Sequence, residues 1–344
     1  MIKKIQFFSK ISIILVFLVI LAGSTVRMTG SGMGCPDWPK CFGYYIPPTD
    51  ISQILFKSNN DYLKGQMILY DKKKLLVAKS DFISNDIINL DNWKVYEKHD
   101  YVLFDPVHTW FEFINRLLGA VLGLSILILF LFSLSSWKNK PIIFITSLLS
   151  LLAVLFQAWL GKTVVDSNLA PYKISIHMLM ALVLVGLLLC VRSFSKRLDF
   201  KIILNKPTTL LIYFSFLLTI IQIALGLQVR EFIDTQIDKW GYDFSNYWLL
   251  YPENNFYVHR SLSVLVLISN FLIYYLIKKQ GSQLTFINKI ILLIAIEIFL
   301  GILMYYFDFP FASQPLHLLV ATFLFGIQFY WILRINKITY GLSI

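Results

Sequence analysis

Eight apolar runs, each about as long as a bilayer is thick, constrain the fold of this chain more than any other feature. A transmembrane helix needs about 20 predominantly apolar residues, and only helices and closed barrels satisfy all backbone polar groups inside lipid. Hydrophobic residues make up 57% of the chain and charged residues 15%, a proportion that no soluble domain buries. We therefore expect an all-α polytopic membrane protein. The first run ends near residue 23, and the others lie at about 109–135, 141–162, 173–191, 208–229, 257–277, 286–306 and 315–334.

The first run has a basic start and an apolar centre, which is the form of a signal peptide as well as of a span. No small-x-small cleavage site follows it, and the stretch from Gly23 to Arg27 recurs later in the chain. We therefore expect it to be retained as the first span. The absence of a long Arg/Ser-rich presequence favours a bacterial protein.

Positive charges in the short loops predict the orientation in the membrane. With eight spans both termini lie on one side, and lysines and arginines gather in the short loops of that side. These residues are Lys138, Lys140, Arg192, Lys196, Arg197, Lys201, Lys206, Lys278, Lys279, Lys289, Arg334 and Lys337. The pattern predicts an inner (cytoplasmic) membrane protein with cytoplasmic termini. It also accounts for the net charge of +11 without a nucleic-acid partner.

The long loop at 30–107 is the only extended polar region, and it is too short and too charged for a separate domain with a large core. It opens with Cys35 and Cys41, and no further Cys pair or His nearby completes a zinc set. If the loop faces an oxidising compartment, the two cysteines are expected to form a disulfide. The alternative is two free thiols. Cys190, at the end of a span, is expected to be inert packing.

The chain uses a four-helix unit twice. The odd-numbered spans end on a glycine that is followed by a short apolar cluster, at Gly23, Gly161, Gly226 and Gly301. The even-numbered spans begin with a polar residue that can bind a ligand, at Asn115, His177, His259 and His317. A parallel repeat of this kind predicts two pseudo-symmetric four-helix bundles at 1–200 and 201–344, each with an equivalent site.

The C-terminal half carries the complete pair, His259 and His317. An ionisable residue inside a membrane span is costly and usually has a partner or a ligand. Two histidines on neighbouring helices could ligate the iron of a heme from both faces. The iron is then six-coordinate and suited to electron transfer. The alternative is two interfacial histidines that are hydrogen-bonded to loop backbone.

The N-terminal half has His177, but Asn115 stands where a second histidine is expected. Glu112 lies three residues before Asn115, on the same helix face, and His108 lies about two turns, or roughly 10 Å, further outward. A carboxylate beside a half-ligated ring site indicates chemistry rather than electron storage. The alternative for Glu112 is an interfacial ion pair with Arg116, four residues on.

Taken together, these residues resemble the heme A synthase family of bacterial and mitochondrial membranes. The resemblance covers nearly the whole chain. It rests on the stretch from Gly23 to Gly32, the paired loop cysteines, Glu112-Phe-Ile-Asn-Arg116, Gly226-Leu-Gln-Val-Arg230, and the histidines at 177, 259 and 317. It implies heme b in the C-terminal bundle, with His259 and His317 as its axial ligands, and a substrate heme in the N-terminal bundle. The implied reaction oxidises the C8 methyl of heme O to a formyl group, through hydroxymethyl and hydrated-aldehyde stages, and gives heme A for terminal oxidase biogenesis.

The family's glutamate–x–x–histidine–arginine motif matches Glu112 and Arg116, which makes Glu112 the candidate catalytic residue. Asn115 replaces the motif's histidine, so His177 is expected to hold the substrate iron alone, or together with His108 after a helix shift. Arg116 and Arg260 each follow a ring-facing position, where they would neutralise heme propionates, although an interfacial arginine needs no such role. The cysteine pair is expected to order the long loop over the N-terminal site.

The resemblance also implies partners. Heme O is the expected substrate and water the expected oxygen source, with heme O synthase and an electron acceptor as partners in the lipid membrane; a homo-oligomer is left open. Two other classes stay open as well. A di-heme quinol-type oxidoreductase would need four good iron ligands, and Asn115 is a poor iron ligand. A non-catalytic heme carrier or assembly factor would have no need of Glu112.

Overall fold

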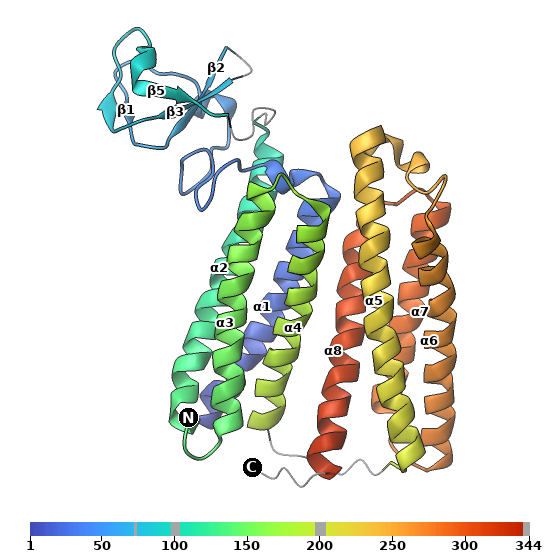
Figure 1. Cartoon of the computed structure of the whole chain (residues 1–344). Coiled ribbons are helices and arrows are strands. Elements are labelled where there is room, and N and C mark those ends of the chain that lie inside the picture. Colours follow the sequence, from blue (N-terminus) through green and yellow to red (C-terminus); the bar gives the residue numbers. More distant parts are fainter. Residues whose placement is uncertain (72–73, 98–103, 197–203, 340–344) are drawn as a thin grey trace.

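The computed structural model describes residues 1–71, 74–97, 104–196 and 204–339, with backbone only at 336–339. Within these residues eight helices are long and apolar enough to cross a membrane, and they run side by side (Figure 1). This confirms the predicted all-α polytopic fold. The helices are α1 (Ile2–Met28), α2 (Pro106–Ser133), α3 (Pro141–Asp166), α4 (Pro171–Ser195), α5 (Lys206–Trp240), α6 (Asn254–Lys279), α7 (Thr285–Tyr306) and α8 (Ser313–Thr339).

Local sequence signals fix where several of these helices begin. Proline stands in the first turn of α2, α3, α4 and α5, where its missing N–H costs nothing and its fixed φ suits the helix. The Asp105 side chain caps α2 by accepting a hydrogen bond from the His108 N–H at 2.9 Å. Asn205 caps α5 in the same way, through the Thr208 N–H at 3.0 Å. The even-numbered helices therefore start close to their predicted site residues.

Helix α5 extends well beyond the predicted span of 208–229, because it continues to Trp240. Hydropathy marks only the part that crosses lipid, whereas the polar continuation is stabilised by packing. Ile233 and Ile237 are buried against Trp248, which follows the short 3-10 helix η5 (Tyr242–Tyr247). The Trp248 indole N–H donates to the carbonyl of Gly241 at 3.1 Å, and Gly241 ends the helix with φ at +84°.

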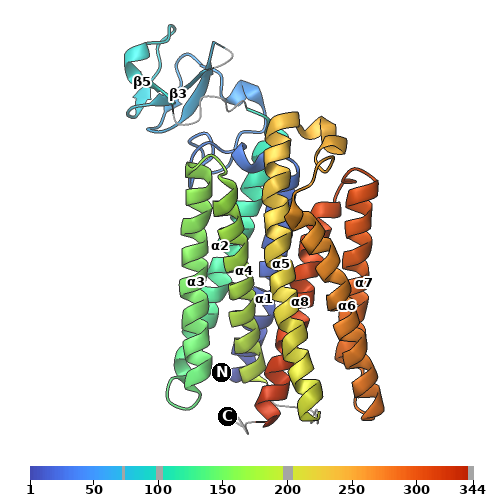
Figure 2. The same ribbon diagram turned by 45° about the vertical axis from the view of Figure 1, so that its right-hand side comes forward.

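The helices pack as two groups of four. In the first group α1 contacts α2 and α4, and α3 contacts α2 and α4; in the second group α5 contacts α6 and α8, and α7 contacts α6 and α8. Each group has its own apolar core, one around Ile126 and Leu184 and the other around Ile273 and Ile290. The groups meet where α1 and α4 face α5 and α8 (Figure 2). The predicted domain boundary at 200/201, and with it Arg197 and Lys201, lies outside the described residues.

The long loop forms a small β structure at one end of the first group of helices (Figure 1). It has a two-stranded antiparallel sheet of β1 (Asp61–Tyr62) and β4 (Phe82–Ile83). A second antiparallel sheet has the order β2 (Met67–Tyr70), β3 (Lys74–Ala78), β5 (Trp93–Val95). The sequence analysis did not predict these strands. Their core is small, as expected, and consists of two buried clusters: Tyr62, Ile68, Leu76, Ala78 and Trp93 form one, and Met67 and Leu75 form the other with Cys35, Cys41 and Phe42.

The start of α1 and the end of α8 lie at the end of the molecule opposite to the β structure (Figure 1). Because α2, α4, α6 and α8 all run away from the β-structure end, their first turns share that end. Asn115, His177, His259 and His317 all lie within the first three turns of these helices. The fold therefore brings the four ligand-type residues to one level of the membrane region.

Candidate functional site

His259 on α6 and His317 on α8 face each other across the second group of helices. Their ring centroids are 6.4 Å apart, and the ring planes are inclined by 72°. A Cβ on Gly226 would lie 3.1 Å from the His259 ring, so α5 needs a small residue there. The Gln222 side chain donates to the His259 carbonyl at 2.9 Å, and the Gln222 carbonyl lies 3.2 Å from His259 Nδ1.

This geometry fits a bis-histidine iron site. Two metal–nitrogen bonds of about 2 Å each, with the ring radius on either side, add up to roughly 6 Å between ring centres. Both histidines have Nδ1 close to an oxygen: His259 faces the Gln222 carbonyl, and His317 Nδ1 lies 3.0 Å from Glu297 Oε2. A partner at Nδ1 leaves Nε2 free for a metal. The residues present therefore suit a heme held from both faces.

Glu297 is a site residue that the sequence analysis missed. It lies on α7, four residues before Gly301, inside an apolar span. An acidic residue at such a position is itself a signal of function. The signal was available in the sequence, but the prediction considered only residues at the heads of the even-numbered spans.

The N-terminal half repeats the arrangement with different side chains. A Cβ on Gly23 of α1 would lie 3.5 Å from Asn115 Oδ1, and a Cβ on Gly161 of α3 would lie 3.6 Å from the His177 ring. The Gln157 side chain donates to the His177 carbonyl at 3.1 Å, as Gln222 does to His259. Within the described part of the chain, Asn115 Oδ1 and His177 Nδ1 are buried and have no hydrogen-bond partner. Buried polar atoms are almost always satisfied, so these two atoms indicate a ligand or ordered water.

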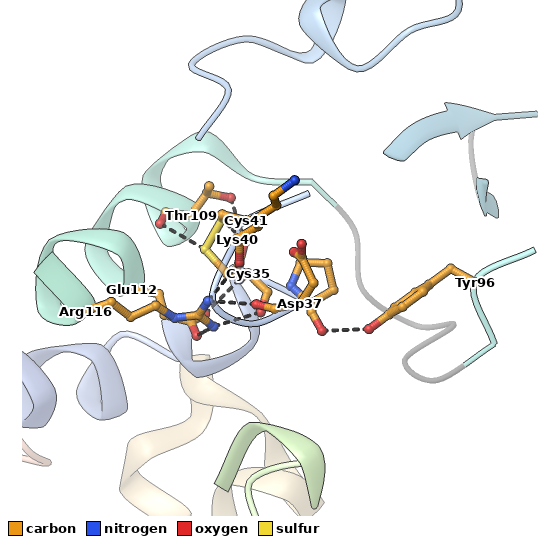
Figure 3. A network of polar contacts seen from close by, with 10 residues as sticks. Cys35, Asp37, Lys40, Cys41, Tyr96, Thr109, Glu112 and Arg116 are labelled. Atoms are coloured by element: carbon orange, nitrogen blue, oxygen red, sulfur yellow. Dashed lines mark hydrogen bonds and ion pairs between the residues drawn. A yellow bond between two sulfur atoms is a disulfide. The ribbon is translucent and has the colours of Figure 1, made fainter. Parts of the chain in front are cut away.

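Glu112 and Arg116 form a buried ion pair in the N-terminal turns of α2 (Figure 3). The second carboxylate oxygen of Glu112 accepts the Cys35 N–H at 2.7 Å. Arg116 also donates to the carbonyls of Cys35 at 3.1 Å, Asp37 at 2.7 Å and Lys40 at 3.0 Å. The pair predicted as the alternative for Glu112 is thus present, and it fastens the long loop to α2. A propionate contact would require Arg116 to leave these partners.

Cys35 and Cys41 form the predicted disulfide, and the loop around them is pressed closely onto α2. The Thr109 hydroxyl donates to the Gly34 carbonyl at 2.9 Å. A Cβ on Gly34 would lie 2.4 Å from the His108 carbonyl, so only glycine allows this approach. The disulfide loop therefore covers the outer turns of α2 that carry Glu112 and Arg116.

Asp37 is a half-buried acid of this loop. Its carboxylate accepts the Gly43 N–H at 2.9 Å. Burial raises the pKa of the Asp37 carboxyl above its ordinary value, while backbone hydrogen bonds and the Arg116 guanidinium offset part of that rise. The positive charge of Arg116 therefore stabilises two carboxylates, Glu112 on α2 and Asp37 in the loop.

Two other predicted site residues are solvent-facing or lipid-facing. His108 is exposed in the first turn of α2. Arg260 is exposed on α6, and its guanidinium carbon lies 6.0 Å from the centre of the Phe256 ring and 5.8 Å from that of Tyr257. The equivalent arginines 116 and 260 thus have different surroundings, because only the N-terminal half has a long loop for its arginine to bind.

A polar cluster joins the two groups of helices near the site level. Asp234 of α5 accepts hydrogen bonds from Arg27 of α1, with the Arg27 Nε at 3.0 Å, and pairs with Arg230 at 2.9 Å. Arg230 also donates to Gln314 of α8, and Arg27 donates to the sulfur of Met178. Arg27 and Arg230 each stand four residues after a repeat glycine. The cluster therefore links the helix turn of His177 with that of His317.

Eight helices that are long and apolar enough to cross a membrane define a multi-pass membrane protein, and two of them present histidines that face each other at a distance that suits two ligands of one iron. A sequence model of the COX15-CtaA family, described as cytochrome oxidase assembly protein, matches residues 6–77 and 96–329. The chain belongs to this family.

Named relatives agree with this membership. A heme A synthase from Ehrlichia canis is 23% identical over 92% of this chain and 88% of its own length. A heme A synthase from Flavobacterium johnsoniae is 22% identical over 94% of this chain and 95% of its own length. The heme A synthase of Shewanella oneidensis is 27% identical over a shorter alignment, 52% of this chain and 42% of that protein.

Proposed function

We propose that this chain is a heme A synthase that oxidises the C8 methyl of heme O to a formyl group. The observation that carries the proposal is the contrast between the two sites. The C-terminal half offers two histidines whose rings are 6.4 Å apart, whereas the N-terminal half offers one histidine, His177, and Asn115 at the position equivalent to His259. The first arrangement suits a resident redox cofactor, and the second suits a substrate that binds and leaves.

In the C-terminal site, His259 and His317 would hold heme b as its two axial ligands. Heme b supplies one-electron redox chemistry when it is bound. The protein holds the His259 ring in place: Gln222 contacts the backbone and Nδ1 of His259, and Gly226 leaves room beside that ring. Arg260 stands next to His259 at the exposed edge of α6, where a propionate would reach it with little rearrangement.

In the N-terminal site, His177 would hold the iron of the substrate heme, and Asn115 would face the substrate without ligating iron. Asparagine is a poor iron ligand, so the substrate would be held less firmly than heme b. A farnesylated substrate dissolves in lipid, so a site between helices is reachable from the membrane. His108, exposed at the start of α2, is the further histidine that a shift of that helix would bring closer.

Glu112 would be the catalytic residue of this site. Converting a methyl to a formyl group with water as oxygen source releases four protons and four electrons for each methyl oxidised, so a proton acceptor is needed. Arg116 and the Cys35 N–H hold the Glu112 carboxylate in place and stabilise its negative charge. A carboxylate so held can take a proton from the reacting group or stabilise positive charge at its carbon. The electrons would leave through the C-terminal site to an acceptor protein.

The setting of this reaction is the bacterial inner membrane. Both termini would be cytoplasmic, and the disulfide loop would face the oxidising side. Heme O synthase would deliver the substrate, and a terminal oxidase would receive the product. The Glu112–Arg116 pair makes a passive heme carrier the weaker alternative, because a carrier needs no buried carboxylate at a substrate site. A di-heme quinol-type oxidoreductase is disfavoured by Asn115.

The proposal is tested by analysing the hemes of membranes from cells that co-express this chain with a heme O producer. A heme A synthase converts heme O into heme A in these membranes, whereas cells with the heme O producer alone accumulate heme O. Protein that binds heme in the same cells but leaves only heme O would identify a carrier or an electron-transfer protein.

A further inference from the structure

One further position of the repeat contacts the histidines on the neighbouring helices. It lies four residues, about one helical turn, before each repeat glycine, and it is occupied by Val19, Gln157, Gln222 and Glu297. On α3 and α5 the glutamine donates to the backbone carbonyl of the histidine on the next helix. On α7 the residue is acidic, and it reaches the histidine ring itself.

Glu297 is placed where a carboxylate is expensive. Its side chain is only 14% exposed, and α7 is apolar on either side of it. A buried carboxylate costs several kcal/mol or more unless it is paired. The polar group nearest to it in the structure is the His317 ring, with Oε2 at 3.0 Å from Nδ1. A glutamine, as on α3 and α5, would have filled the same space without a charge.

We propose that Glu297 is a positioning residue for His317, whose Nδ1–H its carboxylate accepts while Nε2 faces the heme iron. This inference rests on the proposed heme b site. A carboxylate behind a metal-bound histidine fixes its tautomer and ring orientation and makes the ligand a stronger donor. Glu297 therefore does not touch the heme, and it acts on the heme through His317.

The two axial ligands are then unequal. His259 has the neutral carbonyl of Gln222 beside its Nδ1, whereas His317 has a carboxylate. Negative charge and a stronger donor both stabilise the ferric state over the ferrous state, so Glu297 lowers the reduction potential of the heme. The protein would thus set the potential from α7, through the contact of Glu297 with His317.

The test is a redox titration of the heme in the purified full chain, with Glu297→Gln as the main variant. Glutamine keeps the shape and removes the charge. We expect the low-spin heme to stay bound and the ratio of reduced to oxidised heme at a fixed potential to rise at least tenfold. For a one-electron couple this is an increase of about 59 mV or more in the reduction potential. Glu297→Asp, which keeps the charge on a shorter side chain, should lie closer to the native protein.

Gln222→Ala is the matched control, because it removes the side chain at the equivalent position but keeps the carbonyl that faces His259. Its potential should change much less than that of Glu297→Gln. A native potential in Glu297→Gln, or a shift no larger than in Gln222→Ala, would overturn the inference. If Glu297→Gln loses heme, retention by Glu297→Asp supports the role of the carboxylate, and loss by both variants in folded protein overturns it as a tuning residue. Failure of the proposed heme site is a separate result, in which the native protein itself binds no low-spin heme.

Discussion

The two halves of the molecule have the same four-helix arrangement, but the buried acidic residue near the site lies at a different place in each half. In the C-terminal half Glu297 lies behind a histidine ring, within the apolar part of α7. In the N-terminal half the equivalent residue is Gln157, and the acid is Glu112, fastened to Arg116 and the disulfide loop at the outer end of α2. A carboxylate that accepts the Nδ1–H of an iron-bound histidine changes the reduction potential of the iron. A carboxylate beside a substrate can instead exchange protons with it. Under the proposed function, this difference separates an electron site in the C-terminal half from a reaction site in the N-terminal half.

The halves also differ in what covers them. The N-terminal half has the long loop with its two small sheets and its disulfide, whereas the C-terminal half has the short helix η5 and Trp248 packed on the end of α5. The loop packs over Glu112, which is buried and accepts the Cys35 N–H. The shared cluster of Arg27, Asp234 and Arg230 ties the two unlike halves together at the level of their sites.

The largest expected effect is the loss of the C-terminal heme. His259→Ala and His317→Ala should each remove the low-spin spectrum of the purified protein, because a single remaining histidine cannot complete a six-coordinate iron. The measurement is absorption and EPR spectroscopy of protein purified from the same membranes. His108→Ala, in the other half, should keep the spectrum. An unchanged spectrum in both histidine variants would refute the assignment of the ligands.

The next effect concerns the acid of the reaction site. Glu112→Gln should keep heme b bound while heme A production falls at least tenfold, which corresponds to about 1.4 kcal/mol or more of barrier. Glu112→Asp should retain part of the activity, since it keeps the charge. Arg116→Gln is the structural control, because it releases the loop carbonyls of Cys35, Asp37 and Lys40 but keeps the acid. If Glu112→Gln makes heme A at the native rate, Glu112 only holds the loop on α2. The catalytic residue would then have to be His108 or His177.

A smaller effect should follow when one half is made to resemble the other. Asn115→His supplies the second ligand that the C-terminal half has in His259, so substrate heme should co-purify in several-fold greater amount and in a low-spin state. The measurement is heme content and EPR of protein from cells that make heme O. Asn115→Gln, which adds length without a good iron ligand, is the control. If Asn115→His leaves bound substrate heme unchanged, residue 115 does not face the iron.

The smallest expected effect is on the cover of the reaction site. Cys35→Ser with Cys41→Ser opens a short ring, so the loss of stability should be about 2–3 kcal/mol at most. It should appear as faster proteolysis within the long loop, with the helices intact, because Arg116 and Thr109 still hold the loop on α2. Mass mapping of the native protein without reductant tests the bond itself. Alkylation of both thiols would contradict the disulfide.

The sequence predicted the features that depend on local physics. The eight spans follow from the need to satisfy backbone groups in lipid, and the structure reproduces them within a few residues except at α5, whose outer part is polar and held by Trp248. Ionisable residues at span heads identified His259 and His317. The cysteine pair followed from its spacing and from the absence of further metal ligands nearby.

What the sequence did not predict depends on tertiary contacts. The strands of the long loop are two to five residues long, too short for alternation to distinguish them from turns. The pairing of Glu112 with Arg116 followed from their i, i+4 spacing, but the Cys35 N–H and the loop carbonyls could not be foreseen. Glu297 is visible in the sequence as an acid inside an apolar span, but its contact with His317 depends on the packing of α7 against α8.

The most direct test of whether the C-terminal site transfers electrons and the N-terminal site carries out the reaction compares His177→Ala with His317→Ala in cells that make heme O. Both the low-spin heme of the purified protein and the heme A content of the membranes are measured for each variant. We predict that His177→Ala keeps the low-spin heme b but produces no heme A, whereas His317→Ala loses the low-spin heme. If His177→Ala instead loses the low-spin heme, or produces heme A at the native rate, the account of one electron site and one reaction site is wrong.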